Sequence, residues 1–273
     1  MRVVLEVRQE LSRPISLKGI NLSGFFAFST SELQKVTLTH LGRPLLFGEI
    51  FKVNTADSDR DEVIFTGSTR MLNYCGHGLS SGRVIIDGNT GSCAGMEMSG
   101  GELTVKGDAG SCLGVALTGG KITVLGNAGD WCGAALAGES KGMNGGLILV
   151  GGNAGCELGS AMQRGLIAVA GNCDKYAGSR MYAGTIICLG DIGAHPGLGM
   201  QRGSLVTGTI GSILPGFKPA GFADTGWLRL YLNWLPHNGF TIPSGWLERS
   251  PGWFSGDHLA SGKGEILAYE FPQ

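Results

Sequence analysis

Apolar and polar residues alternate along the middle of the chain in a pattern that recurs every 19 residues. Its third and fifth positions are apolar in every copy, as in Leu103 and Val105, whereas the residues beside them vary. Period-two spacing of apolar, mostly β-branched residues predicts a short strand with one face turned inward. Six copies begin at Gly82, Gly101, Gly120, Gly146, Gly165 and Gly184. A degenerate copy precedes them over 63–78, and another begins at Gly203.

Each copy also carries fixed turn residues after its strand. Its seventh position is always Gly and its eighth is Asn or Asp, a pair that predicts left-handed turn conformations. A second Gly at position fourteen indicates another corner, and the apolar residue at position seventeen predicts a return to the interior. One copy cannot bury these side chains alone, but stacked copies can. The sequence therefore predicts an all-β fold, a right-handed parallel β-helix (a solenoid) with 19-residue coils.

The regular spacing is broken once, because 26 residues separate Gly120 from Gly146. We place the surplus at Glu139–Gly145 and expect it to bulge out as a loop. This placement assigns Leu136 to the inward seventeenth position of its copy.

The two ends of the chain lack the repeat and are expected to cap it, because terminal coils expose unpaired strand edges. The predicted organisation is a small N-terminal cap at 1–60, the parallel β-helix at 61–212 and a Trp-rich C-terminal capping segment at 213–273. In the first cap, the sequence predicts two strands around a turn at 42–44, after a short helix near Ser31. In the last, 225–236 predicts a short amphipathic helix that Thr225 caps and Pro236 ends.

The outward strand positions become apolar in the later copies, and a continuous apolar face does not stay exposed. Either the chain's own C-terminal segment or another subunit must cover it. We expect contacts with other subunits there, on the inserted loop and on the C-terminal helix. The residues concerned are Leu147, Leu149, Leu166, Ile187, Leu189, Lys141, Met143, Trp227 and Trp234.

Composition adds mainly exclusions. Glycine makes up 49 of 273 residues, which fits many tight turns, and the formal net charge of −1 with scattered charges argues against nucleic acid as a partner. No apolar stretch is long enough for a membrane span, and no signal peptide is evident. Seven Cys then favour reduced thiols and a cytoplasmic location.

Candidate chemistry is sparse. Cys93 and Cys112 share one position in adjacent copies and could come within disulfide distance, although a reducing compartment opposes that bond. Neither they nor His77 belong to a pattern with four metal ligands. We therefore expect no catalytic residue, no metal and no cofactor-binding residue in this chain.

The repeats at 100–120 and 119–138, the KGMNGG segment at 141–146 and ILPGFKPAG at 213–221 resemble the C-type subunit of formylmethanofuran dehydrogenase. The repeat array is also similar to the C-terminal domain of the glutamate synthase large subunit. The ending, with WLRLYLNWL and GKGEILAYE, looks more like the bacterial version, the C-type subunit of the formyltransferase/hydrolase complex of methylotrophs.

That resemblance implies a cytoplasmic complex that acts in one-carbon oxidation and has four kinds of subunit. In such a complex a formyl group passes from tetrahydromethanopterin to a methanofuran-type carrier and is then released as formate. The D-type subunit is implied to transfer the formyl group, and the amidohydrolase-like A-type subunit to hydrolyse it with a metal. This chain would then be a non-catalytic scaffold whose partners are these two subunits and the B-type subunit. Two alternatives remain open, an accessory domain of a flavin amidotransferase and a stand-alone enzyme. Neighbouring genes would separate the first alternative from the scaffold, and turnover by the purified chain would establish the second.

Overall fold

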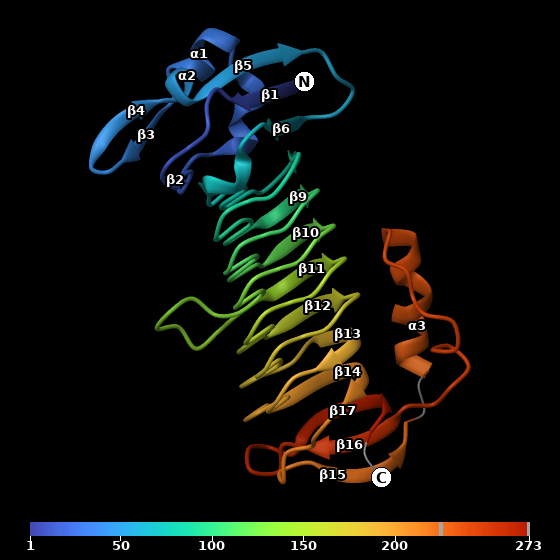
Figure 1. Cartoon of the computed structure of the whole chain (residues 1–273). Coiled ribbons are helices and arrows are strands. Elements are labelled where there is room, and N and C mark those ends of the chain that lie inside the picture. Colours follow the sequence, from blue (N-terminus) through green and yellow to red (C-terminus); the bar gives the residue numbers. More distant parts are fainter. Residues whose placement is uncertain (224–225, 272–273) are drawn as a thin grey trace.

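A computed structural model describes residues 1–223 and 226–271 of the chain (Figure 1). Its main feature is one sheet of 13 strands, in the order β15-β16-β17-β14-β13-β12-β11-β10-β9-β8-β6-β1-β5. The strands that share this sheet are β1 (Arg2–Val7), β5 (Phe51–Ala56), β6 (Glu62–Thr66), β8 (Arg83–Ile86), β9 (Ser99–Val105), β10 (Gly119–Val124), β11 (Asn144–Val150), β12 (Arg164–Val169), β13 (Thr185–Ile192), β14 (Arg202–Ile210), β15 (Lys218–Phe222), β16 (Gly252–Gly256) and β17 (Lys263–Glu270).

The centre of the sheet is a ladder of parallel strands, one from each copy of the repeat. Val105 of β9 pairs with Val124 of β10, which pairs with Val150 of β11, which in turn pairs with Val169 of β12. All four side chains are buried, so the predicted inward row is confirmed. The turns stack as well, because parallel bridges join Ala109 to its equivalents in the copies before and after it. Each copy therefore contacts the next at its strand and again at its turn.

The Asn or Asp at position eight acts differently from the prediction. None of these residues has a left-handed backbone. Instead the Asn89 side-chain oxygen accepts the backbone N–H of Asp108, 2.7 Å away, and Asp108 accepts that of Asn127 at the same distance. The preceding Gly is required for a related reason, since a Cβ at Gly107 would overlap the Asn89 oxygen. The Gly at position seven and the Asn or Asp at position eight thus hold successive copies of the repeat together.

Left-handed backbone occurs at the second corner. Gly95 has φ 65° and Gly114 has φ 59°, as predicted for position fourteen. Position twelve is also left-handed although it holds no glycine, a conformation that disfavours L side chains. Its occupants are Tyr74, Cys93, Cys112, Trp131, Glu157, Tyr176 and His195.

The inserted loop begins earlier than predicted. The Met143 N–H donates to the Gly133 carbonyl, as the Leu117 N–H donates to Gly114 and the Met162 N–H to Gly159. Met143 is fully buried, whereas Leu136 is only half-buried. Met143 therefore occupies the inward seventeenth position, and the insertion is 136–142. The prediction that Met143 contacts another subunit is wrong, because the residue belongs to the core.

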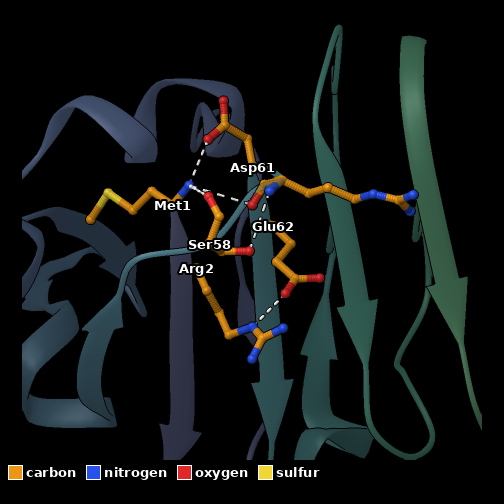
Figure 2. A network of polar contacts seen from close by, with 6 residues as sticks. Met1, Arg2, Ser58, Asp61 and Glu62 are labelled. Carbon is orange, nitrogen blue, oxygen red and sulfur yellow. Dashed lines mark hydrogen bonds and ion pairs between the residues drawn. The ribbon is translucent and has the colours of Figure 1, made fainter.

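The N-terminal segment extends the sheet and adds a small lobe. The additional elements are β2 (Ile15–Ser16), the 3₁₀ turn Leu22–Ala27, α1 (Thr30–Gln34), β3 (Thr37–His40), β4 (Arg43–Leu46) and α2 (Phe47–Ile50). Strand β2 pairs in parallel with β7 (Leu72–Asn73), which follows the 3₁₀ turn Thr69–Met71 in the degenerate copy of the repeat. The predicted hairpin is confirmed as β3–β4, and α1 is the helix expected near Ser31. Figure 2 shows how this lobe joins the ladder. The Met1 amine lies 3.0 Å from an Asp61 carboxylate oxygen, and Arg2 of β1 pairs with Glu62 of β6.

The C-terminal segment closes the other end. Strand β17 pairs in parallel with β14, and β16 and β15 follow in antiparallel order. The α3 helix (Gly226–Trp234) runs beside the ladder in Figure 1 and continues into a 3₁₀ turn at Leu235–Asn238. The α-helix therefore ends before Pro236, and the predicted cap Thr225 lies outside the described residues.

Candidate partner-binding surfaces

The apolar outer face of the ladder is covered by the chain's own C-terminal segment. Leu149 and Ile187 are buried with Leu228 and Leu232 of α3 in a second hydrophobic core, separate from the one inside the ladder. Leu147 and Leu166 are also buried in it, and Leu189 packs against it. Of the two covers that the sequence left open, the structure shows this one. The four buried residues, Leu147, Leu149, Leu166 and Ile187, are therefore not free to contact another protein, which corrects that prediction for them. Leu189 is only partly buried, so its contact with another subunit stays a prediction.

Helix α3 nevertheless has a second apolar side. Its inward residues are two Leu spaced four apart, but Leu230 is 73% exposed and Trp234 is 44% exposed. Trp227 is half-buried and packs at the edge of the second core. A helix that is apolar on opposite sides is typical of an element buried between two layers. The sequence had singled out Trp227 and Trp234 but missed Leu230, whose i, i+4 spacing from Trp234 was the available signal.

A groove of about 430 Å³ lies between α3 and the ladder. Tyr231 and Trp234 form its helical side, and Leu147, Leu166 and Thr185 lie on its sheet side. Arg164 lines it too and makes no ion pair with the described residues. The groove therefore combines aromatic surface with one available cation, a combination common at protein interfaces.

A second groove, of about 560 Å³, lies on the other side of the ladder beside the inserted loop. Its floor is a small apolar cluster that includes Cys93, Met96, Val115 and Ala134. Residues 136–139 of the loop line one wall, and Trp131 is 44% exposed at the edge. Lys141 projects from the same loop and is exposed. We call this the loop groove.

Polar groups gather at two places in the loop groove. An Arg180 guanidinium nitrogen lies 3.3 Å from a Glu157 carboxylate oxygen and 3.1 Å from the Ser160 hydroxyl. At the opposite end, Cys112 and Tyr74 donate hydrogen bonds that lower the pKa of the Cys93 thiol to about 6, against the opposing effect of its burial. The same contact with Cys93 raises the pKa of Cys112. The sequence placed Cys93 and Cys112 in register but did not reveal the groove above them.

Metal chemistry finds no support in the part of the chain that the structure describes. Within residues 1–223 and 226–271, no three His, Cys, Asp or Glu side chains come together as a metal site would need. His77 lies 3.5 Å from Glu97, without a third ligand. Across the same ranges, no helix has the length and hydrophobicity needed to cross a membrane.

Comparison with known proteins identifies a similar solved structure. No family model matches the chain, and no curated protein does. Among solved structures, the fold is similar to a chain of the X-ray crystal structure of the formyltransferase/hydrolase complex (FhcABCD) from Methylorubrum extorquens in complex with methylofuran. The TM-score is 0.89 and the sequences are 35% identical, over 97% of this chain and 98% of that chain.

Proposed function

The chain belongs to the family of that chain of the formyltransferase/hydrolase complex, and from this premise we propose that it is the C-type subunit of such a complex. The observation that carries the proposal is the 35% identity over 97% of this chain and 98% of the other, which leaves no large segment of either without a counterpart. The repeat and tail motifs that resemble the C-type subunit support the assignment to that position in the complex.

We further propose that the ladder is a right-handed parallel β-helix. The pairing of strands one copy apart, the bridges between successive turns and the shared buried row support this architecture. The right-handed sense of the β-helix is supported by the strong preference of crossover connections between parallel strands for right-handedness. Such a stack is rigid and elongated, which suits it to hold other proteins at fixed separations.

In the proposed complex this chain is a scaffold and has no active site of its own. Its partners are a D-type formyltransferase subunit, an amidohydrolase-like A-type subunit that holds a metal, and a B-type subunit. The complex moves a formyl group from formyl-tetrahydromethanopterin to a methanofuran-type carrier and releases formate. The similar complex was crystallised with methylofuran, which supports a carrier of the methanofuran type.

The proposed docking surfaces are the outer side of α3, with Trp227, Leu230 and Trp234, and the inserted loop with Lys141. Leu230, Trp234 and Lys141 are exposed and therefore open to a partner. Copurification tests the proposal. When this chain carries an affinity tag in its native host, the amidohydrolase-like and formyltransferase-like proteins should be retained with it. Recovery of the tagged chain alone would overturn the assignment.

Surface variants locate the contacts. Leu230→Asp combined with Trp234→Asp should greatly reduce retention of at least one partner and leave the thermal unfolding of the isolated chain nearly unchanged. Leu259→Asp is the matched control, because Leu259 is 85% exposed and lies in the β16–β17 connection. Equal retention by both proteins would exclude α3 as a docking element, while the copurification result would still decide whether the chain belongs to the complex.

A further inference from the structure

Among the residues that the structure describes, the thiols in the loop groove form a chemically reactive cluster that the scaffold role leaves unused. Cys93 and Cys112 occupy the same position of adjacent copies, with φ of 64° and 63°. Each donates its backbone N–H to a carbonyl of the next copy over 2.8 Å, so the two backbones are stacked with nearly identical geometry. Stacked chains lie about 4.8 Å apart, and a disulfide requires Cα atoms about 4.4–6.8 Å apart.

We propose that Cys93 and Cys112 are a redox-active thiol pair, which a peroxide that enters the loop groove converts reversibly into a disulfide linking two adjacent copies. Both residues line the groove, so a small oxidant reaches them without opening the fold. The inference is independent of the partners proposed above.

The surroundings of the pair favour reaction at Cys93. The thiolate is the nucleophilic form, and the Cys112 and Tyr74 donors hold the Cys93 pKa below that of an ordinary thiol. The Lys18 charge acts in the same direction, and its ammonium lies 5.6 Å from the centre of the Tyr74 ring. Two nearby carboxylates act on the neighbours of Cys93: the Glu97 charge raises the pKa of Tyr74, and the Asp130 charge raises the pKa of Cys112. The result is a partly shielded thiolate with a second thiol in contact.

The chemistry balances in two steps. The Cys93 thiolate attacks one oxygen of hydrogen peroxide, the O–O bond breaks, and a sulfenic acid forms while the released hydroxide becomes water. Cys93 no longer carries charge, so its own contribution to the raised Cys112 pKa is lost, while burial and Asp130 still raise that pKa. The Cys112 sulfur then attacks the Cys93 sulfur, the S–O bond breaks, and the departing hydroxide takes the Cys112 proton to form a second water. Two thiols are oxidised and one peroxide is reduced.

The other cysteines provide internal controls. Cys173 and Cys188 also contact each other, but both are buried and neither lines the loop groove. Cys156 is accessible, but its thiol lies 3.3 Å from an Asp174 carboxylate oxygen, and burial and that carboxylate raise its pKa. Cys75 and Cys132 are buried, and burial raises the pKa of each to about 12. The proposal therefore requires a reaction that is selective among seven cysteines.

The test is mild treatment of the full-length protein with hydrogen peroxide, followed by peptide mapping. We expect loss of two hydrogen atoms, one peptide cross-link between Cys93 and Cys112, and full reversal by dithiothreitol. In the Cys112→Ser variant, Cys93 should stop at the sulfenic acid and be labelled by dimedone. A Cys156→Ser variant should still form the cross-link.

Three results would overturn the proposal. They are oxidation of Cys156 or the Cys173–Cys188 pair before Cys93, irreversible oxidation of Cys93 without a cross-link, and no reaction at Cys93 under conditions that oxidise free cysteine. All three results are measured on the protein without substitutions, so the test remains valid even if a variant fails to fold.

The Tyr74→Phe variant checks the role of Tyr74 as a positioning residue. Loss of this donor should shift the pH profile of Cys93 oxidation to higher pH. An unchanged profile would show that Tyr74 does not lower the pKa of Cys93.

Discussion

At the scale of single residues, the position of Met143 shows how the ladder tolerates an insertion. The inward seventeenth position must be filled in every copy, and Met143 fills it with a fully buried side chain. Met143→Ala should lower the free energy of unfolding by about 2–5 kcal/mol, the usual range when a large core side chain is truncated. Leu136→Ala is the matched control and should cost less than about 1 kcal/mol, since Leu136 is half-buried at the loop. Chemical denaturation measures both, and a reversed order would place Leu136, rather than Met143, in the core.

Buried thiols also make stability depend on alkaline pH. Burial raises the pKa of Cys132 from 9.0 to about 12, so the folded state keeps the proton that the unfolded chain loses above pH 9. The unfolded state then binds fewer protons, and the free energy of unfolding falls as pH rises from about 9 to 12. The Cys132→Ala variant should be less stable at pH 7 but should lose stability less steeply over that range. Denaturation curves at several pH values test this, and parallel pH dependences would contradict it.

At the scale of elements, the inserted loop should be separable from the fold. Deleting 136–142 joins Ala135 to Met143 and restores a 19-residue spacing, with Met143 still at the inward position. The shortened chain should keep a melting temperature close to the original, because no core side chain is removed. If the loop docks a partner, the same deletion should reduce copurification. A large fall in the melting temperature would show that the loop supports the ladder.

Helix α3, unlike the inserted loop, should be required for stability because it covers the apolar outer face of the sheet. Leu149 is 2% exposed beneath it, so Leu149→Asp would bury a charge without a partner. We expect the isolated chain to lose several kcal/mol of stability or to release α3. Lys121, whose ammonium lies 3.2 Å from the Asn238 carbonyl, holds the end of the same segment. Circular dichroism and limited proteolysis near α3 measure the effect, and a variant as stable as the parent would mean that another protein provides the cover.

The repeat explains which features the sequence could predict. Inward positions such as Val105 follow from spacing alone, because every copy has the same neighbours above and below. Met143 was misplaced because sequence spacing cannot distinguish two alignments of a Gly-rich insertion, whereas the hydrogen bond to Gly133 can. The Asn89 contact depends on the register between copies, and the cover over Leu149 depends on a segment about 80 residues later in the chain. Local patterns carry little information about either contact.

At the scale of the whole molecule, the main sheet runs through all three segments that the sequence distinguishes. Strand β1 contributes from the first, β8–β14 from the second and β17 from the third. The ends therefore act as continuations of the ladder, each protecting a strand edge. Because β17 pairs with β14, that edge of β14 is not open to pairing with another chain.

The role of the C-terminal segment can be tested by removing residues 213–273. The shortened chain would expose the edge of β14 together with the apolar side chains of Leu149, Leu166 and Ile187. Exposed strand edges and large apolar patches promote association, so the 1–212 protein should form oligomers or aggregates at concentrations where the full chain remains dispersed. Light scattering of both proteins at matched concentrations provides the measurement, and adding Leu149→Asp and Leu166→Asp to the shortened chain should partly restore dispersion. A shortened protein that stays monomeric without those changes would mean that the ladder tolerates an open end, and the C-terminal segment would then matter chiefly for binding partners.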